Sequence, residues 1–160
     1  MHWNDIKRPT GEHIKFKKLN PSDTLLLEKV ALLILTALAG EPPNDTETLS
    51  RITDELMERD TIIAVIGRGE VLATGSLDRL DNDNTTVCNV VTSPEVRGCG
   101  LGSAVLKLIE EQASQEHTTQ IILFPTYTSQ EFYQHRGYTE DPLSGNYSKI
   151  VTPVAKLPSQ

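Results

Sequence analysis

The feature that most constrains this sequence is residues 97–102, RGCGLG, in which three glycines alternate with other residues. A β-branched segment, residues 85–92, precedes this loop and is typical of a strand. The loop leads into a segment with apolar residues at helical spacing: Leu101, Val105, Leu108 and Ile109. A short apolar run at 121–124 comes next. The order of strand, glycine loop, helix and strand predicts a parallel crossover unit inside a mixed sheet.

The glycine loop is suited to hold an anion. The first N–H groups of a helix have no intrahelical acceptor, and the helix dipole adds about half a positive charge at that end. Glycine lets a phosphate approach the backbone closely and accepts unusual dihedral angles. Arg97 and Ser103 are further donors at the two ends of the loop.

Other glycine-rich motifs could also explain these glycines and must be compared with a general anion site. A Walker A loop needs a lysine before its final Ser or Thr, but Gly102 is followed directly by Ser103. A Rossmann fingerprint needs Gly-x-Gly-x-x-Gly, whereas here one residue separates each pair of glycines. Both nucleotide motifs are therefore disfavoured. A plain tight turn between strand and helix remains the alternative.

The other elements follow from hydrophobic periodicity and from turn residues. Strands are expected at 13–19, 61–66, 71–80 and 146–151, and the middle two form a hairpin around the turn at 67–70. One helix is expected from a cap at Ser22 or Asp23 to about residue 38, stopped by Gly40. A second begins at Asp45 or Thr46 with Leu49, Ile52 and Leu56 on its apolar face, and a short one spans 129–136, closed by Gly137.

Size and charge restrict the class of protein. The chain has 160 residues, which predicts one domain over residues 12–160 behind a loose arm at 1–11. A formal net charge of −7 argues against nucleic-acid binding, which needs a basic surface. Cys88 and Cys99 fit neither a disulfide framework nor a metal spacing, so no metal is expected. No signal peptide or membrane span is recognisable, which predicts a cytoplasmic protein.

Two motifs together resemble the GNAT superfamily of N-acetyltransferases. Residues 90–102, VVTSPEVRGCGLG, are similar to its cofactor motif, and residues 131–138, EFYQHRGY, are similar to its Phe-Tyr-x-x-x-Gly-Phe ending. The resemblance covers roughly residues 12–151. It implies an α/β (α+β) GNAT fold, a mixed and mostly antiparallel central sheet of six to seven strands flanked by about four helices. Two parallel strands would splay apart at the cofactor cleft.

The resemblance also implies site residues. Loop amides from Val96 to Gly102 would hold the pyrophosphate of coenzyme A, and strand residues 90–92 would pair with the pantetheine arm. Tyr133 would protonate the leaving thiolate, the N–H of Val91 would stabilise the oxyanion, and Phe132 is expected to be the core aromatic. The cofactor-binding set is Val90, Val91, Thr92, Arg97, Gly98, Cys99, Gly100, Leu101, Gly102, Ser103, Thr126, Ser129 and Tyr133.

The general base is harder to assign. Many members of the superfamily carry a Glu on the strand before the loop, but residues 85–91 hold no carboxylate. Proton removal through water and backbone carbonyls is the alternative. His117 and His135 are weaker candidates, because a lone surface histidine is usually not catalytic. Neither cysteine has a His or Asn neighbour in sequence that would make it a nucleophile.

For the acceptor, residues 32–38 and 71–77 resemble glucosamine 6-phosphate N-acetyltransferases, enzymes of UDP-GlcNAc synthesis that often form dimers. The acceptor side departs from that family at Cys88, Asn89 and Phe124. A sugar phosphate would need cations, for which Arg136, Lys149 and the group Lys15, Lys17 and Lys18 are available. The alternatives are another amine (a polyamine, an amino acid or a protein lysine) and a non-catalytic acyl-CoA-binding module.

Overall fold

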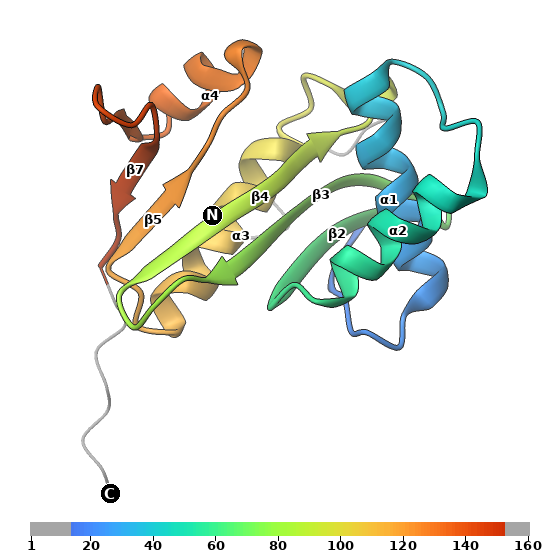
Figure 1. Cartoon of the computed structure of the whole chain (residues 1–160), viewed down its shortest axis with the longest axis horizontal. Coiled ribbons are helices and arrows are strands. Elements are labelled where there is room, and N and C mark those ends of the chain that lie inside the picture. The colour runs from blue at the N-terminus through green and yellow to red at the C-terminus, as the bar shows by residue number, and fades with distance from the viewer. Residues whose placement is uncertain (1–13, 153–160) are drawn as a thin grey trace, which may run out of the picture. The chain divides into compact units, whose positions relative to one another are not determined.

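The computed structural model describes residues 14–152 (Figure 1). The strands are β1 (Ile14–Lys18), β2 (Thr61–Gly67), β3 (Glu70–Arg79), β4 (Asn84–Thr92), β5 (Gln120–Leu123), β6 (Thr139–Glu140) and β7 (Tyr147–Ile150). The α-helices are α1 (Thr24–Ala39), α2 (Thr46–Met57), α3 (Leu101–Gln115) and α4 (Gln130–Gln134), and 3-10 helices span Pro94–Val96 and Tyr127–Ser129. The arm expected over residues 1–11 lies outside the described residues.

The seven strands form one sheet in the order β1-β2-β3-β4-β5-β7-β6. β1 is antiparallel to β2, and β7 is antiparallel to both β5 and β6. β4 and β5 run parallel, with Asn84 opposite Gln120 and Thr86 opposite Ile122, and α3 is the crossover between them. The predicted mixed, mostly antiparallel sheet with a parallel crossover is therefore confirmed. β6 is the addition, a two-residue strand too short to leave a periodic signal in sequence.

Contacts divide the described residues into two compact units. The first unit comprises residues 14–76 and 89–108, and the second unit comprises residues 77–88 and 109–152. The bounds of β3 and β4 cross from one unit to the other, so each of these strands contributes residues to both. The single domain expected over residues 12–160 stays a prediction.

The core of the first unit lies between the sheet and the helix pair α1 and α2. Ile62 and Ala64 of β2 belong to the same buried cluster as Leu27 and Val30 of α1 and Leu56 of α2. The intervening β2 residues Ile63 and Val65 are also buried, and they point to the opposite face because side chains alternate along a strand. Both faces of β2 therefore carry buried side chains.

The helix ends match the sequence expectations with one exception. Gly40 ends α1 with φ of 78°, and Asp45 caps α2 by accepting from the N–H of Thr48 at 2.6 Å. Asp23 stands at the N-cap of α1 but makes no side-chain cap bond. Its carboxylate instead accepts from the N–H of Asn20 at 2.8 Å, which tightens the turn before the helix.

The core of the second unit is built around tyrosines. Tyr138 and Tyr147 are 2% and 1% exposed and are among the largest fully buried side chains of the described residues. Ile121 and Leu123 of β5 are buried as well, and the Thr85 and Thr118 hydroxyls are hydrogen-bonded at 2.6 Å. In this unit β5 pairs with the N-terminal end of β4 on one side and with β7 on the other.

Candidate active site

β4 changes character at Asn89. Burial alternates along its first half, with Thr85 and Val87 buried, and then every residue from Cys88 to Thr92 is half-buried. Asn89 has a φ of 56°, in the left-handed region that Asn tolerates better than most residues. One left-handed residue in a strand kinks it and redirects the side chains that follow, as β-bulges do. The structure thus gives Asn89 a backbone role that the sequence pattern did not indicate.

The glycine loop follows a short, well-anchored turn. The N–H of Ser93 donates to the carbonyl of Leu72 at 2.8 Å, and Val96 is buried before the loop begins. Gly98 and Gly100 have φ values of 81° and 82°. A Cβ built on either glycine would meet no heavy atom of the described residues within 4 Å. Glycine is therefore required here by backbone conformation, on a side of the loop that none of residues 14–152 fills.

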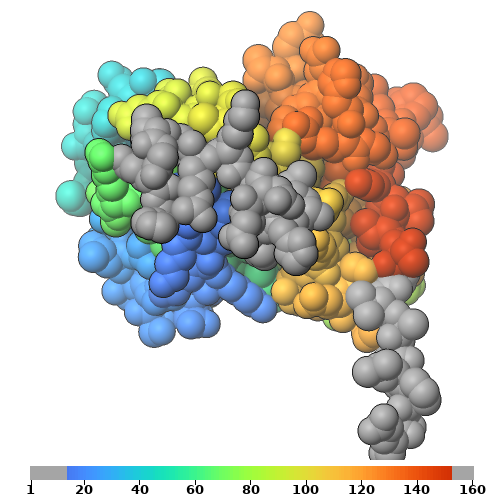
Figure 2. Space-filling view, turned by 180° about the vertical axis from the view of Figure 1, so that it is seen from behind, coloured from blue at the N-terminus to red at the C-terminus, as the bar shows by residue number. Residues whose placement is uncertain are grey.

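The loop ends in the first turn of α3. The N–H of Ala104 donates to the carbonyl of Gly100 at 3.1 Å, which is the first helical bond of α3. The amides of Leu101 and Gly102 precede it and have no helical carbonyl four residues back. Figure 2 shows this stretch, coloured yellow, at the surface of the first unit. Backbone N–H donors, the helix dipole and the positive-φ glycines together are suited to bind a phosphate group.

The loop side chains play different parts. Leu101 is 1% exposed and anchors α3 in the core, so only its backbone is available to a ligand. Arg97 is exposed, whereas Cys99 and Ser103 are half-buried. Cys88 and Cys99 are both free thiols. The expected loop donors therefore come from backbone amides and from Arg97.

In the second unit, three of the predicted site residues lie on the segment after β5. Phe124 is 71% exposed directly after the last residue of the strand. The Thr126 hydroxyl donates to the Ser129 hydroxyl at 2.9 Å, and the Ser129 hydroxyl donates to the Thr126 carbonyl at 3.0 Å. These bonds close the 3-10 turn that leads into α4. Both hydroxyls are therefore bonded to one another within the described residues.

Tyr133 is the buried aromatic of α4. It is 7% exposed, whereas Phe132 is only half-buried, so the expectation that Phe132 fills the core position is wrong. The Tyr133 ring contacts Phe132 and Tyr138 edge-on, at centroid distances of 5.1 Å and 5.6 Å. Burial, with a smaller contribution from Cys88, raises the pKa of Tyr133 to about 12. Tyr133 therefore keeps its proton at neutral pH.

The Arg136 side chain stacks on the half-buried ring of Phe132, next to Tyr133. Its guanidinium lies 3.7 Å from the centroid of the Phe132 ring, and it donates to the Phe132 carbonyl at 2.7 Å. Burial lowers the pKa of Arg136 from its usual value, and Tyr133 partly offsets this. This stacked geometry is typical of a cation–π pair and holds Phe132 away from the core.

The two histidines considered as bases are both at the surface. His117 has a φ of 64° and closes the C-terminus of α3, a position more often taken by glycine. His135 is exposed and lies 3.4 Å from the Glu131 carboxylate. Among the described residues there is no group of three or more His, Cys, Asp and Glu side chains placed to hold a metal ion. In the same part of the chain, no helix is both long and apolar enough to cross a membrane.

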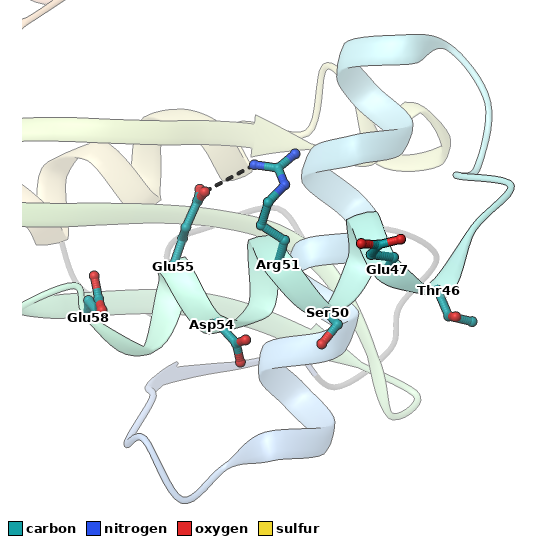
Figure 3. Close-up of a pocket in the computed structure, with 7 residues that line it drawn as sticks. All are labelled: Thr46, Glu47, Ser50, Arg51, Asp54, Glu55 and Glu58. Carbon is teal, nitrogen blue, oxygen red and sulfur yellow. Dashed lines mark hydrogen bonds and ion pairs between the residues drawn. The ribbon is translucent and has the colours of Figure 1, made fainter.

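A separate hollow of about 690 Å³ lies on the outer face of α2 (Figure 3). It is lined by polar and charged side chains: Thr46, Glu47, Ser50, Arg51, Asp54, Glu55 and Glu58. Arg51 and Glu55 form an ion pair at 3.1 Å, both well exposed. All seven residues come from one helix and its end, so the hollow is a solvated helix surface rather than a site assembled from several elements.

The comparison that decides the family is a match of residues 32–138 to the model of the acetyltransferase (GNAT) family. This stretch is more than half of the chain and contains both the glycine loop and α4. The chain belongs to the GNAT acetyltransferase family. The GNAT fold predicted from the two sequence motifs is thereby confirmed, and so is the acetyltransferase class.

Solved acetyltransferase structures share this fold at low sequence identity. An acetyltransferase of the GNAT family from Staphylococcus aureus is 18% identical, with a TM-score of 0.69 over 88% of this chain and 100% of that one. A predicted acetyltransferase with acetyl-CoA from Clostridium acetobutylicum is 17% identical, with a TM-score of 0.68 over 81% of this chain and 92% of that one. PaiA N-acetyltransferase from Thermoplasma acidophilum, in complex with coenzyme A, is 16% identical, with a TM-score of 0.65 over 88% and 99%. No curated protein sequence matches this GNAT chain.

Proposed function

We propose that this protein transfers the acetyl group of acetyl-CoA to a primary amine. The single observation that carries the proposal is the glycine loop, where Gly98 and Gly100 hold positive φ angles at the start of α3. Amides at a helix N-terminus bind a pyrophosphate, and glycines let it come close. The Clostridium and Thermoplasma structures were solved with acetyl-CoA and coenzyme A, which supports the same co-substrate here.

The residues proposed to hold acetyl-CoA come from three segments. The amides of residues 96–102, with the Arg97 guanidinium, would bind the pyrophosphate. The backbone of residues 90–92 would hydrogen-bond to the pantetheine arm beyond the kink at Asn89. The Thr126 and Ser129 hydroxyls would release the hydrogen bond between them and form hydrogen bonds to the cofactor.

The proposed reaction needs no covalent intermediate on the protein. The amine nitrogen attacks the thioester carbonyl carbon, so that a C–N bond forms and the C–S bond breaks. The N–H of Val91 donates to the carbonyl oxygen as negative charge grows on it. The Tyr133 hydroxyl gives its proton to the departing thiolate and is reprotonated from solvent, which also receives the proton lost by the amine. Tyr133 is protonated at neutral pH, which is the form that can donate.

The proposal also concerns which amine accepts the acetyl group. The resemblance at residues 32–38 and 71–77 makes glucosamine 6-phosphate the first candidate. Lys17 and Lys149, two of the cations considered for its phosphate, are already in ion pairs at 3.2 Å and 3.0 Å. This pairing and the net charge of −7 favour a second candidate, a cationic amine such as a polyamine, drawn in by electrostatic steering.

A thiol-release assay with acetyl-CoA tests the proposal. We expect release of free CoA with at least one of glucosamine 6-phosphate, spermidine, free amino acids and lysine peptides. Release with glucosamine 6-phosphate alone would identify the sugar phosphate, and release with spermidine alone would identify the cationic acceptor. Tight CoA binding without release of free CoA for any amine would contradict the enzymatic function. It would indicate a non-catalytic acyl-CoA-binding module instead.

A further inference from the structure

A partly buried polar cluster in the second unit joins three elements that are distant in sequence. Glu110 lies on α3, Tyr138 lies just before β6, and Lys149 lies on β7. The Tyr138 hydroxyl donates to Glu110 Oε2 at 3.1 Å, and Lys149 Nζ donates to the same oxygen at 3.0 Å. A single carboxylate oxygen therefore fixes both side chains. None of these residues has a part in the proposed acetyl-CoA site.

The cluster is sheltered enough for these bonds to be strong. The Glu110 and Lys149 side chains are 18% and 30% exposed, and Tyr138 is 2% exposed. Hydrogen bonds to an ionised group are shorter and stronger than neutral ones. Burial, and then the negative charge of Glu110, raises the pKa of Tyr138 well above its usual value. Tyr138 therefore remains protonated and is a permanent donor to Glu110.

Tyr138 connects this cluster to Tyr133. The two rings meet edge-on, with centroids 5.6 Å apart and planes inclined by 76°. The N–H of Tyr138 also donates to the carbonyl of Tyr133 at 3.1 Å, across the end of α4. A ring held by a hydroxyl at one end and by its backbone at the other has little freedom to turn. Any ring packed against it is restrained in the same way.

Gly137 adds a further restraint on Lys149. It has a φ of 90°, and a Cβ built there would lie 3.4 Å from Lys149 Cε. The lysine stem thus fills the place where a side chain at residue 137 would lie. Lys149 Nζ is also 5.6 Å from the centroid of the Tyr138 ring. The lysine is held by packing as well as by charge.

We propose that Glu110, acting through Tyr138, is a positioning residue that fixes the Tyr133 ring so that its hydroxyl is aligned with the leaving thiolate. This inference rests on the proposed acetyltransferase function. Misalignment of a reacting group by about 1 Å can lower a rate by up to about 100-fold. The cluster therefore has a kinetic consequence although it touches no substrate.

A double-mutant cycle tests the coupling. We expect Glu110→Gln to lower kcat by about tenfold and to leave KM for acetyl-CoA within about twofold, because only alignment changes. In a Tyr133→Phe background the same change should have no further effect on kcat. Glu111→Gln, an exposed neighbour on α3, is the matched control and should leave kcat unchanged. An equal loss in both backgrounds would overturn the proposal, because it would show a general structural defect.

A measurement independent of activity separates this inference from the proposed function. With 3-fluorotyrosine incorporated, the chain gives four fluorine resonances, assignable by Tyr→Phe substitution at each position. Glu110→Gln should shift or broaden the Tyr133 resonance, as should Tyr138→Phe, which keeps the ring and removes only the hydroxyl. Glu111→Gln should not. If the Tyr133 resonance does not move, the inference is overturned even when the enzyme is active. If the resonance moves but the protein releases no thiol with any amine, Glu110 still positions Tyr133 and the acetyltransferase function is rejected.

Discussion

At the scale of the residue, Tyr133 combines burial with a chemical role. Its pKa is raised to about 12, so the neutral form persists to higher pH than in an exposed tyrosine, whose pKa is about 10. A folded-state pKa above the unfolded one also means that this burial favours folding below about pH 10, an advantage lost as pH rises through about 12. Both effects follow from removing a phenol from water.

Replacing Tyr133 by Phe should lower kcat by about 100-fold, the lower end of what proton transfer by a positioned side chain contributes. KM for acetyl-CoA should change little, because the hydroxyl acts on the leaving group rather than on binding. Wild-type kcat should show no loss attributable to this group below about pH 10. Steady-state kinetics at saturating acceptor over this pH range measure both quantities.

Tyr127→Phe is the matched control for that experiment. Tyr127 is 89% exposed on the same stretch of chain, so its loss should leave kcat unchanged. A Tyr133→Phe enzyme as fast as wild type would contradict the acid role and leave Tyr133 as a core aromatic.

At the scale of the element, the loop before α3 allows binding to be separated from stability. Gly100 and Gly40 have nearly the same φ, 82° and 78°, and within the described part of the chain a Cβ on either would meet no atom within 4 Å. Alanine at each position should therefore cost a similar amount of stability, about 1–2 kcal/mol, from left-handed strain alone. Only Gly100→Ala should weaken CoA binding, by about tenfold or about 1.4 kcal/mol.

Isothermal titration with CoA, together with denaturant unfolding of both variants, measures these quantities. Equal CoA affinity in Gly100→Ala and Gly40→Ala would mean that the loop glycines serve only the turn, which is the alternative that the sequence left open. Comparable destabilisation in the two variants is the internal check that the strain is matched.

The sequence predicted those features of the elements that depend on local chemistry. Asp45, Gly40 and Gly137 mark helix ends because a carboxylate or a positive φ is needed there, and RGCGLG marks the crossover for the same reason. It did not predict the kink at Asn89, because the surrounding β-branched residues favour a regular strand. Nor could it decide which of the adjacent Phe132 and Tyr133 is buried, because that depends on Tyr138 packing from beyond the helix.

The Glu110 cluster was also out of reach of sequence reasoning. Tyr138 and Lys149 lie 28 and 39 residues from Glu110, and a charged residue on a helix is ordinarily read as solvated. Only the packing of α3 against β7 brings the three together.

At the scale of the whole molecule, two compact units share continuous strands. β3 and β4 each contribute residues to both units, so the chain passes between the units within continuous strands. Small single domains usually unfold in one cooperative transition, and we expect the same here because β3 and β4 belong to both units. A ligand that binds only the folded state must then stabilise both units at once.

CoA at about 100 times its dissociation constant should stabilise the fold by about 2.7 kcal/mol and raise Tm by roughly 5–10 °C for a chain of this length. Differential scanning calorimetry should show a single peak with and without CoA, with the calorimetric and van't Hoff enthalpies equal. Pantetheine, which lacks the pyrophosphate, should give a smaller shift at the same concentration, because the loop amides would have no anion to hold. Two peaks, of which CoA moves only one, would contradict the coupling of the units through β3 and β4, and no shift with CoA would contradict the proposed co-substrate.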